Sequence, residues 1–188
     1  MFGAIVGDII GSVYEWDNIK TKDFPLFRDD CHFTDDTVMT CAVAEGLMNG
    51  GEADDFIDAM KKYGRMFPDA GYGGRFYEWL FSGDREPYNS YGNGSAMRVS
   101  PCAWRMDCGF CARTGIWPTN GRRRAQLSAE VTHNHPEGIK GALAMTGSIA
   151  EAAYGIPDWI KEKAWSYLDE PLKDVLRRWK AFVSPALT

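Results

Sequence analysis

The sequence predicts an all-α fold, and three observations support this prediction. Apolar residues recur at helical rather than strand spacing over most of the chain. Glycine and proline stand where these helical stretches end. With 188 residues, 45% of them hydrophobic, the chain is long enough for one substantial core and too short for two. We therefore expect a single compact helical domain over residues 1–188.

Three stretches show the apolar stripe of a helix most clearly. In each of them apolar residues are spaced three, four, seven or eight positions apart, which places them on one helix face. The stripes are Met39, Ala42, Val43 and Leu47; Phe56, Met60, Tyr63 and Phe67; and Leu172, Val175, Leu176 and Trp179. We expect each stripe to pack into the core.

Helix boundaries and loops can be placed from glycine, proline and polar residues. Gly50–Gly51 is expected to end one helix and Pro68 another, and residues 155–158 combine a helix stop with a new start. The polar stretch 83–92 predicts an exposed loop. Residues 142–153 are rich in alanine and other small residues, which predicts a buried helix that its neighbours approach closely.

Composition excludes several classes of protein. The 21 lysines and arginines are outnumbered by 26 acidic residues, so nothing in the overall charge favours nucleic acid. No apolar run of about 18 residues occurs, so a membrane span is not expected. An odd number of cysteines and an N-terminus without a basic leader favour the cytoplasm. Cys108 and Cys111 lie in a stretch, 108–121, without helical pattern, and we interpret them as ordinary thiols because no further zinc ligands are identifiable.

A compact acidic motif, Thr34-Asp35-Asp36-Thr37, stands at the expected start of a helix. Capping explains such residues, because side-chain oxygens accept hydrogen bonds from free backbone N–H groups and acidic charge suits the positive end of the helix dipole. The same oxygens are hard donors of the kind that magnesium and manganese prefer. From this motif alone we favour the cap and keep a metal site as the alternative.

Asp8 lies in an apolar, glycine-containing stretch that is expected to form the first helix. An aspartate in such surroundings needs a partner, so it is either a buried hydrogen-bond anchor or a catalytic group. Glu15 follows seven residues later, two helical turns on and on roughly the same face. A lone glutamate is usually solvated. Glu15 is a candidate functional residue only because it stands near Asp8 and the other motifs.

Two further segments contain candidate binding residues. The segment from Gly92 to Arg98 places small polar residues before an apolar stretch, where free N–H groups and an arginine would suit phosphate, although such a turn more often only reverses the chain. His133 and His135 flank one asparagine before Pro136 without identifiable further zinc ligands. We favour a substrate-facing or a buried, hydrogen-bonded imidazole over a plain helix break.

In combination, four motifs resemble the ADP-ribosylglycohydrolase family. They are Gly-Ala-Ile-x-Gly-Asp-x-x-Gly-Ser at the start, then Phe-Thr-Asp-Asp-Thr, Gly-Asn-Gly-Ser-Ala-Met-Arg and Thr-His-Asn-His-Pro-Glu-Gly. The resemblance covers roughly residues 1–141, and residues 142–188 are similar to the C-terminal helices of the family. It implies an all-α, shortened ADP-ribosylglycohydrolase-like fold with a two-ion magnesium or manganese centre.

The resemblance also implies roles for individual residues. Thr34, Asp35 and Asp36 would be metal ligands, and both aspartates would take part in catalysis. Glu15 would serve in acid–base or substrate-positioning chemistry. The residues that would meet the diphosphate and ribose are Gly92, Asn93, Gly94, Ser95 and Ala96, with His133 near the substrate. Breaking the anomeric bond builds positive charge on the ribose, which nearby carboxylates stabilise.

One motif that the family carries is absent. Family members have a second acidic motif, Asp-x-Asp after Gly-Gly, and no Asp-x-Asp occurs in this chain. Residues 138–145 run directly into the stretch 146–152, which resembles the helix after that motif. We therefore expect an internal deletion, with one metal ion or none where the family holds two. Loss of core helices would expose apolar surface, so we also expect a homo-oligomer.

Two functions follow from these observations. The first is metal-dependent hydrolysis of the bond that links ADP-ribose to a protein side chain or a small acceptor. The second is a non-catalytic, ADP-ribose-binding or structural remnant of the family, which the missing motif favours and the retained acidic residues oppose. A purely helical interaction protein, with the acidic motif only a cap, would leave the coincidence of four motifs unexplained.

Overall fold

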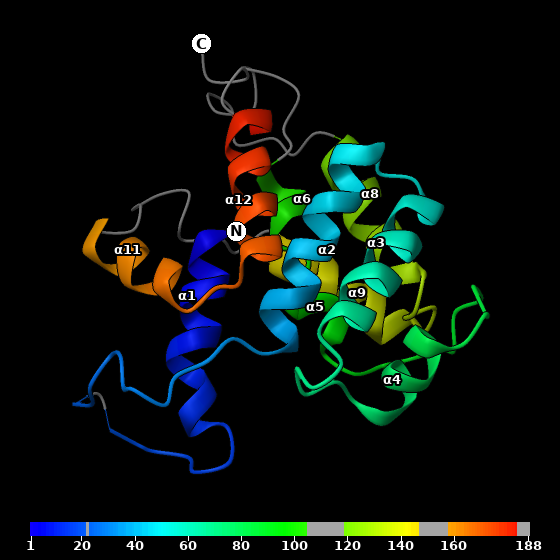
Figure 1. Cartoon of the computed structure of the whole chain (residues 1–188). Helices are drawn as coiled ribbons and strands as arrows, with labels where there is room; N and C mark the ends of the chain where they lie inside the picture. Colours follow the sequence, from blue (N-terminus) through cyan, green and yellow to red (C-terminus); the bar gives the residue numbers. More distant parts are fainter. Residues whose placement is uncertain (22, 105–118, 147–157, 184–188) are drawn as a thin grey trace.

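The structure is a computed structural model that describes residues 1–21, 23–104, 119–146 and 158–183. Within these ranges every regular element is helical, which confirms the predicted all-α class and the single compact domain (Figure 1). In chain order the elements are α1 (Phe2–Gly11), the 3-10 turn η1 (Ser12–Tyr14), α2 (Asp35–Asn49), α3 (Ala53–Met66), α4 (Gly74–Phe81), α5 (Gly94–Met97), α6 (Ser100–Trp104), α8 (Thr119–Glu130), α9 (Pro136–Thr146), α11 (Asp158–Ser166) and α12 (Glu170–Val183). None of these helices is long and apolar enough to cross a membrane.

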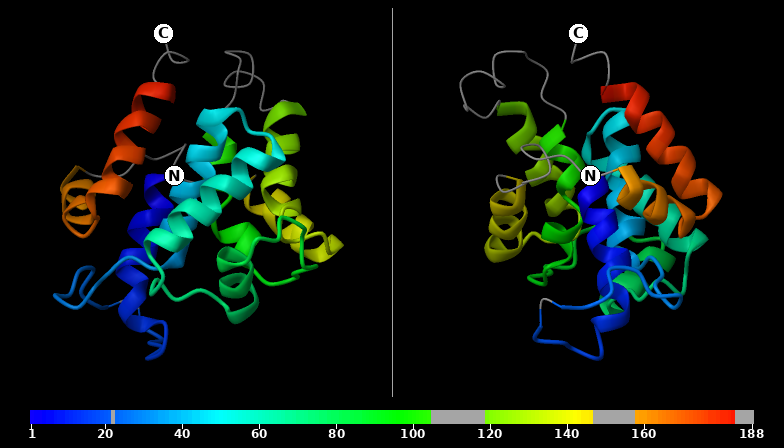
Figure 2. Two further views of the ribbon diagram at one scale, coloured as in Figure 1. Left: turned by 45° about the vertical axis from the view of Figure 1, so that its right-hand side comes forward. Right: turned by 90° about the vertical axis from the view of Figure 1, so that its left-hand side faces the viewer.

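Helix α2 is the central helix of the fold. All of its residues from Thr37 to Leu47 are buried, and α1, α3, α5, α6 and α12 pack against it. Figure 2 shows α11 and α12 on one side of α2 and α8 and α9 on the other. A helix with neighbours on every side has no face for solvated charge, which explains why small and apolar residues dominate its sequence.

The predicted boundaries of the first helices are confirmed. Thr34 is the N-cap of α2 and Gly50 its C-cap. Gly50 and Gly51 have φ angles of 155° and 81°, which favour glycine because a side chain would be strained there. Helix α3 ends at Met66, two residues before Pro68. Helix α2 therefore ends at the glycine pair and α3 ends just before the proline, as predicted.

The remaining predicted segments have mixed outcomes. The stretch 83–92 is an irregular, largely exposed connection between α4 and α5, as expected. Helix α8 begins at Thr119, so the last residues of the stretch 108–121 are helical, contrary to expectation. The predicted buried helix over 142–153 is described only as far as Thr146, the end of α9, and the rest of that stretch, like Cys108 and Cys111, lies outside the described residues.

The three predicted apolar stripes face the core. All of their residues are buried except Phe67, which is half-buried at the C-cap of α3. One charged group lies among them: the Glu45 carboxylate of α2 is 2.5 Å from Arg178 of α12 and 3.3 Å from Lys62 of α3. A buried carboxylate needs such partners, so these ion pairs join α2 to both neighbouring helices.

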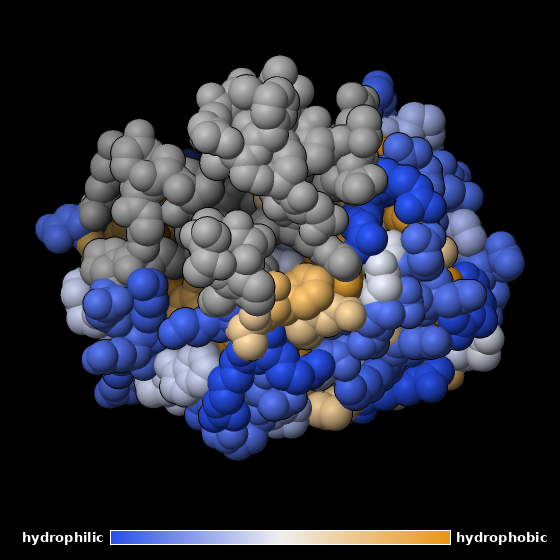
Figure 3. Space-filling view, turned by 90° about the horizontal axis from the view of Figure 1, so that it is seen from above, coloured by the Kyte–Doolittle hydropathy of each residue, from blue (hydrophilic) through white to orange (hydrophobic). Residues whose placement is uncertain are grey.

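Some large apolar side chains stay on the surface. Among the described residues, Trp16, Tyr91 and Trp159 are more than half exposed. The face in Figure 3 is mainly hydrophilic, with an apolar area near its centre. Scattered apolar residues are normal on a protein surface, so the expected self-association stays a prediction.

Helices α2 and α3 pack closely at Gly46. A Cβ added there would lie 2.7 Å from Phe56 Cδ1 and 3.1 Å from Phe56 Cα. We expect Gly46→Ala to lower the free energy of unfolding by about 1–3 kcal/mol, because two packed helices must separate. Gly7→Ala is the control: no atom lies within 4 Å of the added group, so it should stabilise by about 0.5–1 kcal/mol. Chemical denaturation checks both values, and a neutral Gly46→Ala would contradict this packing.

Candidate functional site

The Asp8 side chain holds the first turn of α2. Its Oδ2 accepts hydrogen bonds from the Thr34 N–H at 2.8 Å, the Thr37 N–H at 3.2 Å and the Thr37 hydroxyl at 2.5 Å, and its Oδ1 accepts from the Thr34 hydroxyl at 2.5 Å. The Thr34 oxygen in turn accepts from the Asp36 N–H at 3.3 Å. Asp8 is thus a hydrogen-bond anchor, one of its two predicted roles, and Thr34 is a cap.

Because Asp8 and Thr34 satisfy these first-turn groups, the side chains of Asp35 and Asp36 are left free for other contacts. Burial raises the pKa of Asp35 to about 7, and the charges of Asp36, Asp8 and Glu15 act in the same direction. Burial also raises the pKa of Asp36 to about 6, reinforced by Asp8 and Glu15. Within the described part of the chain, no cation offsets this repulsion.

Two cavities meet at this acidic turn. The first, which we call the carboxylate cavity, has a volume of about 470 Å³ and includes Asp8, Glu15, Thr34 and Asp36 in its lining. The second, the histidine cavity, has a volume of about 330 Å³. Its polar lining is formed by Asp35, Arg75, Tyr88, Ser90, Gly92, Asn93, Gly94, Arg98 and His133. Asn93 and Met97 line both cavities, so the two are adjacent.

The structure therefore gathers most of the predicted site residues. Glu15 lies beyond the end of α1, as the C-cap of η1, and still lines the carboxylate cavity. Ser95 and Ala96 line neither cavity. The buried Ser95 hydroxyl donates to the Gly138 carbonyl of α9 at 2.7 Å, and Ala96 lies beside Gly141 of the same helix. Ser95 and Ala96 thus contact α9 next to the Gly92–Gly94 segment.

Thr34, Asp35 and Asp36 offer hard oxygen donors of the kind that magnesium and manganese prefer. In the described ranges, no group of three or more His, Cys, Asp or Glu side chains is arranged to hold a metal. Magnesium, however, commonly keeps several waters and uses only one or two carboxylates. The two uncompensated carboxylates match that requirement, and the Thr34 oxygen keeps one lone pair beside its two hydrogen bonds.

Arg98, which the less favoured interpretation of its segment assigned to phosphate binding, is fully buried. It is 1% exposed, and its Nη2 donates to the Ser128 carbonyl at 2.9 Å and to the Thr132 hydroxyl at 2.7 Å. Its guanidinium lies 5.7 Å from the centre of the Phe76 ring. Burial lowers the pKa of Arg98 to about 10, so it remains a cation at neutral pH.

His133 is the buried imidazole that the sequence favoured. It is 3% exposed and its Nδ1 is 2.7 Å from the Thr132 hydroxyl oxygen. Burial lowers the pKa of His133 to about 3, the charge of Arg98 adds to this effect, and the Gly92 backbone opposes it. The ring is therefore neutral at physiological pH. His135 points elsewhere and packs on Tyr91, with ring centres 5.5 Å apart.

Arg75 and Tyr88 are site residues that the sequence did not suggest. The Arg75 Nη2 donates to the Tyr88 carbonyl at 2.5 Å, and its guanidinium lies 5.1 Å from the centre of the Tyr88 ring. Burial raises the pKa of the Tyr88 hydroxyl. The only signal in the sequence is the pair Gly73–Gly74 before Arg75, which marks a tight connection without indicating a ligand.

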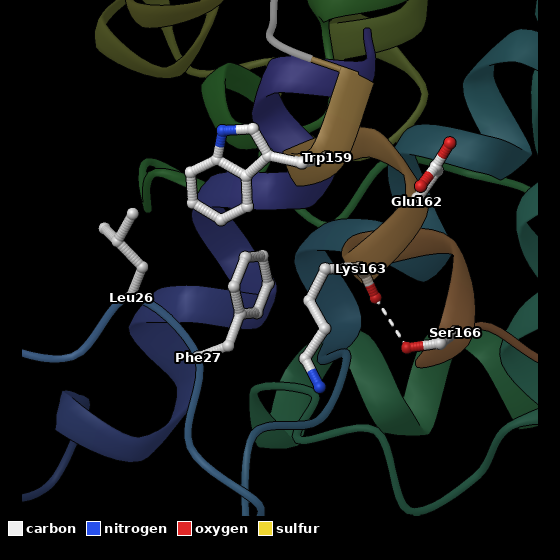
Figure 4. A pocket seen from close by; sticks show the side chains of 6 residues that line it. All are labelled: Leu26, Phe27, Trp159, Glu162, Lys163 and Ser166. Carbon is white, nitrogen blue, oxygen red and sulfur yellow. Dashed lines mark hydrogen bonds between the residues drawn. The ribbon is translucent and has the colours of Figure 1, made fainter.

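A hollow larger than these two cavities lies elsewhere on the described surface. It has a volume of about 750 Å³ and lies between Leu26 and Phe27 of the loop before α2 and Trp159, Glu162, Lys163 and Ser166 of α11 (Figure 4). Trp159 meets Phe27 edge to face, with ring centres 6.5 Å apart. This hollow has no cluster of convergent polar groups, so we assign it no role in catalysis.

Comparison with known proteins agrees with these features. A sequence model of the ADP-ribosylglycohydrolase family matches residues 1–186. The chain is 27% identical over 187 residues to ADP-ribosylhydrolase ARH3 of Mus musculus, covering 82% of this chain and 48% of that protein. The Gallus gallus protein of the same name is 28% identical over 194 residues, with 81% and 49% covered, and the Homo sapiens protein 27% over 186 residues, with 81% and 48%. The chain thus spans about half the length of the curated relatives it matches.

The raised pKa values of Asp35 and Asp36 predict a pH-dependent stability. The folded protein holds these protons more tightly than the unfolded chain, so without metal its stability should fall as pH rises from 3.8 to about 7. We expect Asp35→Asn to raise the melting temperature in chelator at pH 8 by roughly 2–4 °C, with the gain vanishing near pH 4. Magnesium or manganese should stabilise the wild type more than the variant.

Thermal unfolding with metal and with chelator measures both effects. Asp54→Asn is the matched control, because Asp54 also lies in the first turn of a helix but is exposed. A variant that is less stable than the wild type at pH 8 would show that Asp35 acts only as a helix-end charge.

The anchor at Asp8 gives a second prediction. Thr37→Val keeps the shape of a fully buried side chain but removes the hydroxyl that donates to the Asp8 carboxylate. We expect a loss of about 1.5–3 kcal/mol in the free energy of unfolding, as for a hydrogen bond to a charged group. Thr37→Ser keeps the hydroxyl and should lose clearly less. Equal losses in urea unfolding would mean that packing, and not the hydrogen bond, dominates.

Proposed function

The chain belongs to the ADP-ribosylglycohydrolase family, and from this premise we propose that it binds ADP-ribose-containing substrates across its two adjacent cavities and hydrolyses the glycosidic bond to the acceptor. The observation that supports the proposal most is the position of Asp35 and Asp36. They are neighbours in sequence, yet Asp35 lines the histidine cavity and Asp36 the carboxylate cavity. A ligand that spans both cavities would meet negative charge at its middle.

The two cavities differ in charge as an ADP-ribosyl ligand requires. In the histidine cavity, Arg75 and Arg98 supply positive charge and the Gly92–Gly94 segment allows close approach. These features suit the diphosphate. The carboxylate cavity contains Asp8, Glu15 and Asp36, which suit a ribose on which positive charge develops as the anomeric bond breaks.

Individual residues would have distinct roles in the reaction. Thr34, Asp35 and Asp36 would hold magnesium or manganese, which when bound supplies a Lewis acid beside the ribose. Glu15 is the exposed carboxylate of the carboxylate cavity, so it can exchange protons with solvent and would transfer one to or from the reacting groups. Asp8 would keep Asp35 and Asp36 in place through Thr34 and Thr37.

A second function, non-catalytic binding of ADP-ribose, is favoured by one specific observation. The sequence has no Asp-x-Asp motif, which is the motif that the family resemblance assigns to a second ion. Binding through the histidine cavity needs no such motif. The two functions share the ligand and differ in turnover.

Calorimetric titration of ADP-ribose into the full chain, first with magnesium and then with chelator, tests the shared part. We expect binding that requires magnesium and that Asp35→Asn weakens by roughly tenfold or more. Asp54→Asn, an exposed aspartate on α3, should bind as the wild type does. Binding in neither condition would refute both functions.

A hydrolysis assay on arginine-linked and serine-linked ADP-ribosyl substrates separates the two functions. Turnover that depends on magnesium and is lost in Asp36→Asn supports the enzyme. Metal-dependent binding without turnover of either substrate supports the binding protein.

A further inference from the structure

A chain of buried hydrogen bonds lies beneath the histidine cavity. It runs from Arg98, directly after α5, to Thr132 and His133, which follow α8. The Arg98 Nη2 lies 2.7 Å from the Thr132 hydroxyl oxygen, and this oxygen lies 2.7 Å from the His133 Nδ1. All three side chains are at most 3% exposed. Such a chain, shielded from water, can fix the position of a proton.

We infer that Arg98 and Thr132 are positioning residues that keep the proton of His133 on Nε2, so that the histidine cavity presents a neutral N–H donor to an oxygen of the ligand. This inference rests on the proposed function for the identity of the ligand. The tautomer itself follows from the hydrogen bonds alone.

Counting donors leads to this tautomer. A guanidinium only donates, so the Thr132 oxygen accepts from Arg98 and has one hydrogen of its own left to donate. Within the described residues, the His133 Nδ1 is the one acceptor placed for that hydrogen. A protonated Nδ1 would turn a second donor toward the same oxygen and leave the buried hydroxyl hydrogen without an acceptor, which is costly. Nδ1 is therefore the acceptor, and a neutral ring then carries its proton on Nε2.

The charged surroundings also exclude the doubly protonated ring. Arg98 is the nearest charge on the Nδ1 side, and its effect on His133 is to oppose a second positive charge. Arg75 adds another cation to the cavity lining. Asp35 is the one carboxylate in that lining, and its charge is not among the influences on the His133 ring.

The Nε2 side of the ring lies beside Gly94, which lines the cavity together with His133. Nε2 is buried and forms no hydrogen bond of normal geometry with the described residues, although the Gly92 backbone lies close enough to favour a proton on the ring. Gly94 lies directly beside it: a Cβ there would be 3.7 Å from Nε2 and 3.5 Å from Cε1. On the other side, a Cβ on Gly138 would lie 3.0 Å from the His133 Cβ and 3.1 Å from Cδ2. The ring is thus held between two glycines, with an unsatisfied donor that a ligand oxygen would satisfy.

Nitrogen NMR of the ligand-free protein tests the tautomer directly. The chain has three histidines, so His32→Gln and His135→Gln identify the His133 signals. We expect a proton on Nε2 alone between pH 5 and 8. Thr132→Val should give a mixture of tautomers, because the donor to Nδ1 is lost, and Thr132→Ser should restore the wild-type state. A proton on Nδ1, or on both nitrogens, in the wild type would overturn the inference.

Affinity for ADP-ribose tests the consequence for binding. We expect Thr132→Val to weaken binding by about tenfold, the loss of roughly one hydrogen bond, and Thr132→Ser to stay within about twofold of the wild type. Ser128→Ala is the matched control. The Ser128 hydroxyl of α8 is also buried, but it donates to the Ala125 carbonyl and is not part of the hydrogen bonds that link Arg98, Thr132 and His133. This variant should leave the tautomer and the affinity unchanged.

Two negative outcomes remain distinguishable. Unchanged affinity of Thr132→Val in a protein that binds ADP-ribose would overturn the inference and leave the proposed function intact. A wild type that binds no ADP-ribose would refute the proposed function and the role of Nε2 toward that ligand, while the NMR result still decides whether Arg98 and Thr132 set the tautomer.

Discussion

The contact between the Asp8 carboxylate and the first turn of α2 is the constraint on which the site depends. Helix α2 is surrounded by other helices, so its direction is set by packing. Its first turn lines the cavities, so the free backbone N–H groups there need hydrogen-bond partners that leave the cavities open. Asp8 resolves this conflict, because its two oxygens accept from two backbone N–H groups and two hydroxyls. The first turn is satisfied from α1, and the neighbouring carboxylates are released for other chemistry.

Asp35 and Asp36 destabilise the folded protein when they are charged, because no cation among the described residues pairs with their carboxylates. Asp35 and Asp36 lie close to Asp8 and Glu15 in a partly buried place, and their raised pKa values express the repulsion among them. Proteins commonly keep such unfavourable groups at sites where a ligand compensates them. Here the compensation expected from the chemistry of the donors is a divalent cation. Under the proposed function, the stability of the free protein and the affinity of the site for metal would therefore be opposed.

The two cavities differ in the charged groups that line them, and in the proposed function this difference would separate the diphosphate from the ribose. The carboxylate cavity is acidic, whereas the histidine cavity contains two guanidinium groups and an imidazole that burial keeps neutral. Membership in the ADP-ribosylglycohydrolase family is the reason that ADP-ribose is proposed as the ligand of this arrangement. Because the chain spans about half the length of its curated relatives, turnover, metal count and self-association stay predictions. The geometry of the described residues supports binding more directly than it supports cleavage.

The sequence by itself determined the features that depend on neighbouring residues. The helical class, the apolar stripes, the stop at Gly50–Gly51 and the cap at Thr34 follow from patterns within a few positions, because helix geometry and capping act over one or two turns. Of the ten site residues that the family resemblance implied, all except Ser95 and Ala96 line one of the two cavities. Local patterns could not show that the Ser95 hydroxyl is bonded to the Gly138 carbonyl of α9.

Only the tertiary structure decided which distant groups meet and what burial does to them. Asp8 and Thr34 are 26 positions apart, and Arg98 and Thr132 are 34 apart, so no local pattern links them. Their pairing depends on how the helices pack around α2. Packing also decides charge: the same imidazole would titrate near 6.5 in water, and burial beside Arg98 keeps it neutral. The sequence specifies which groups are present. The folded structure sets their protonation, because it determines which charges lie near each group and how far the group is exposed to solvent.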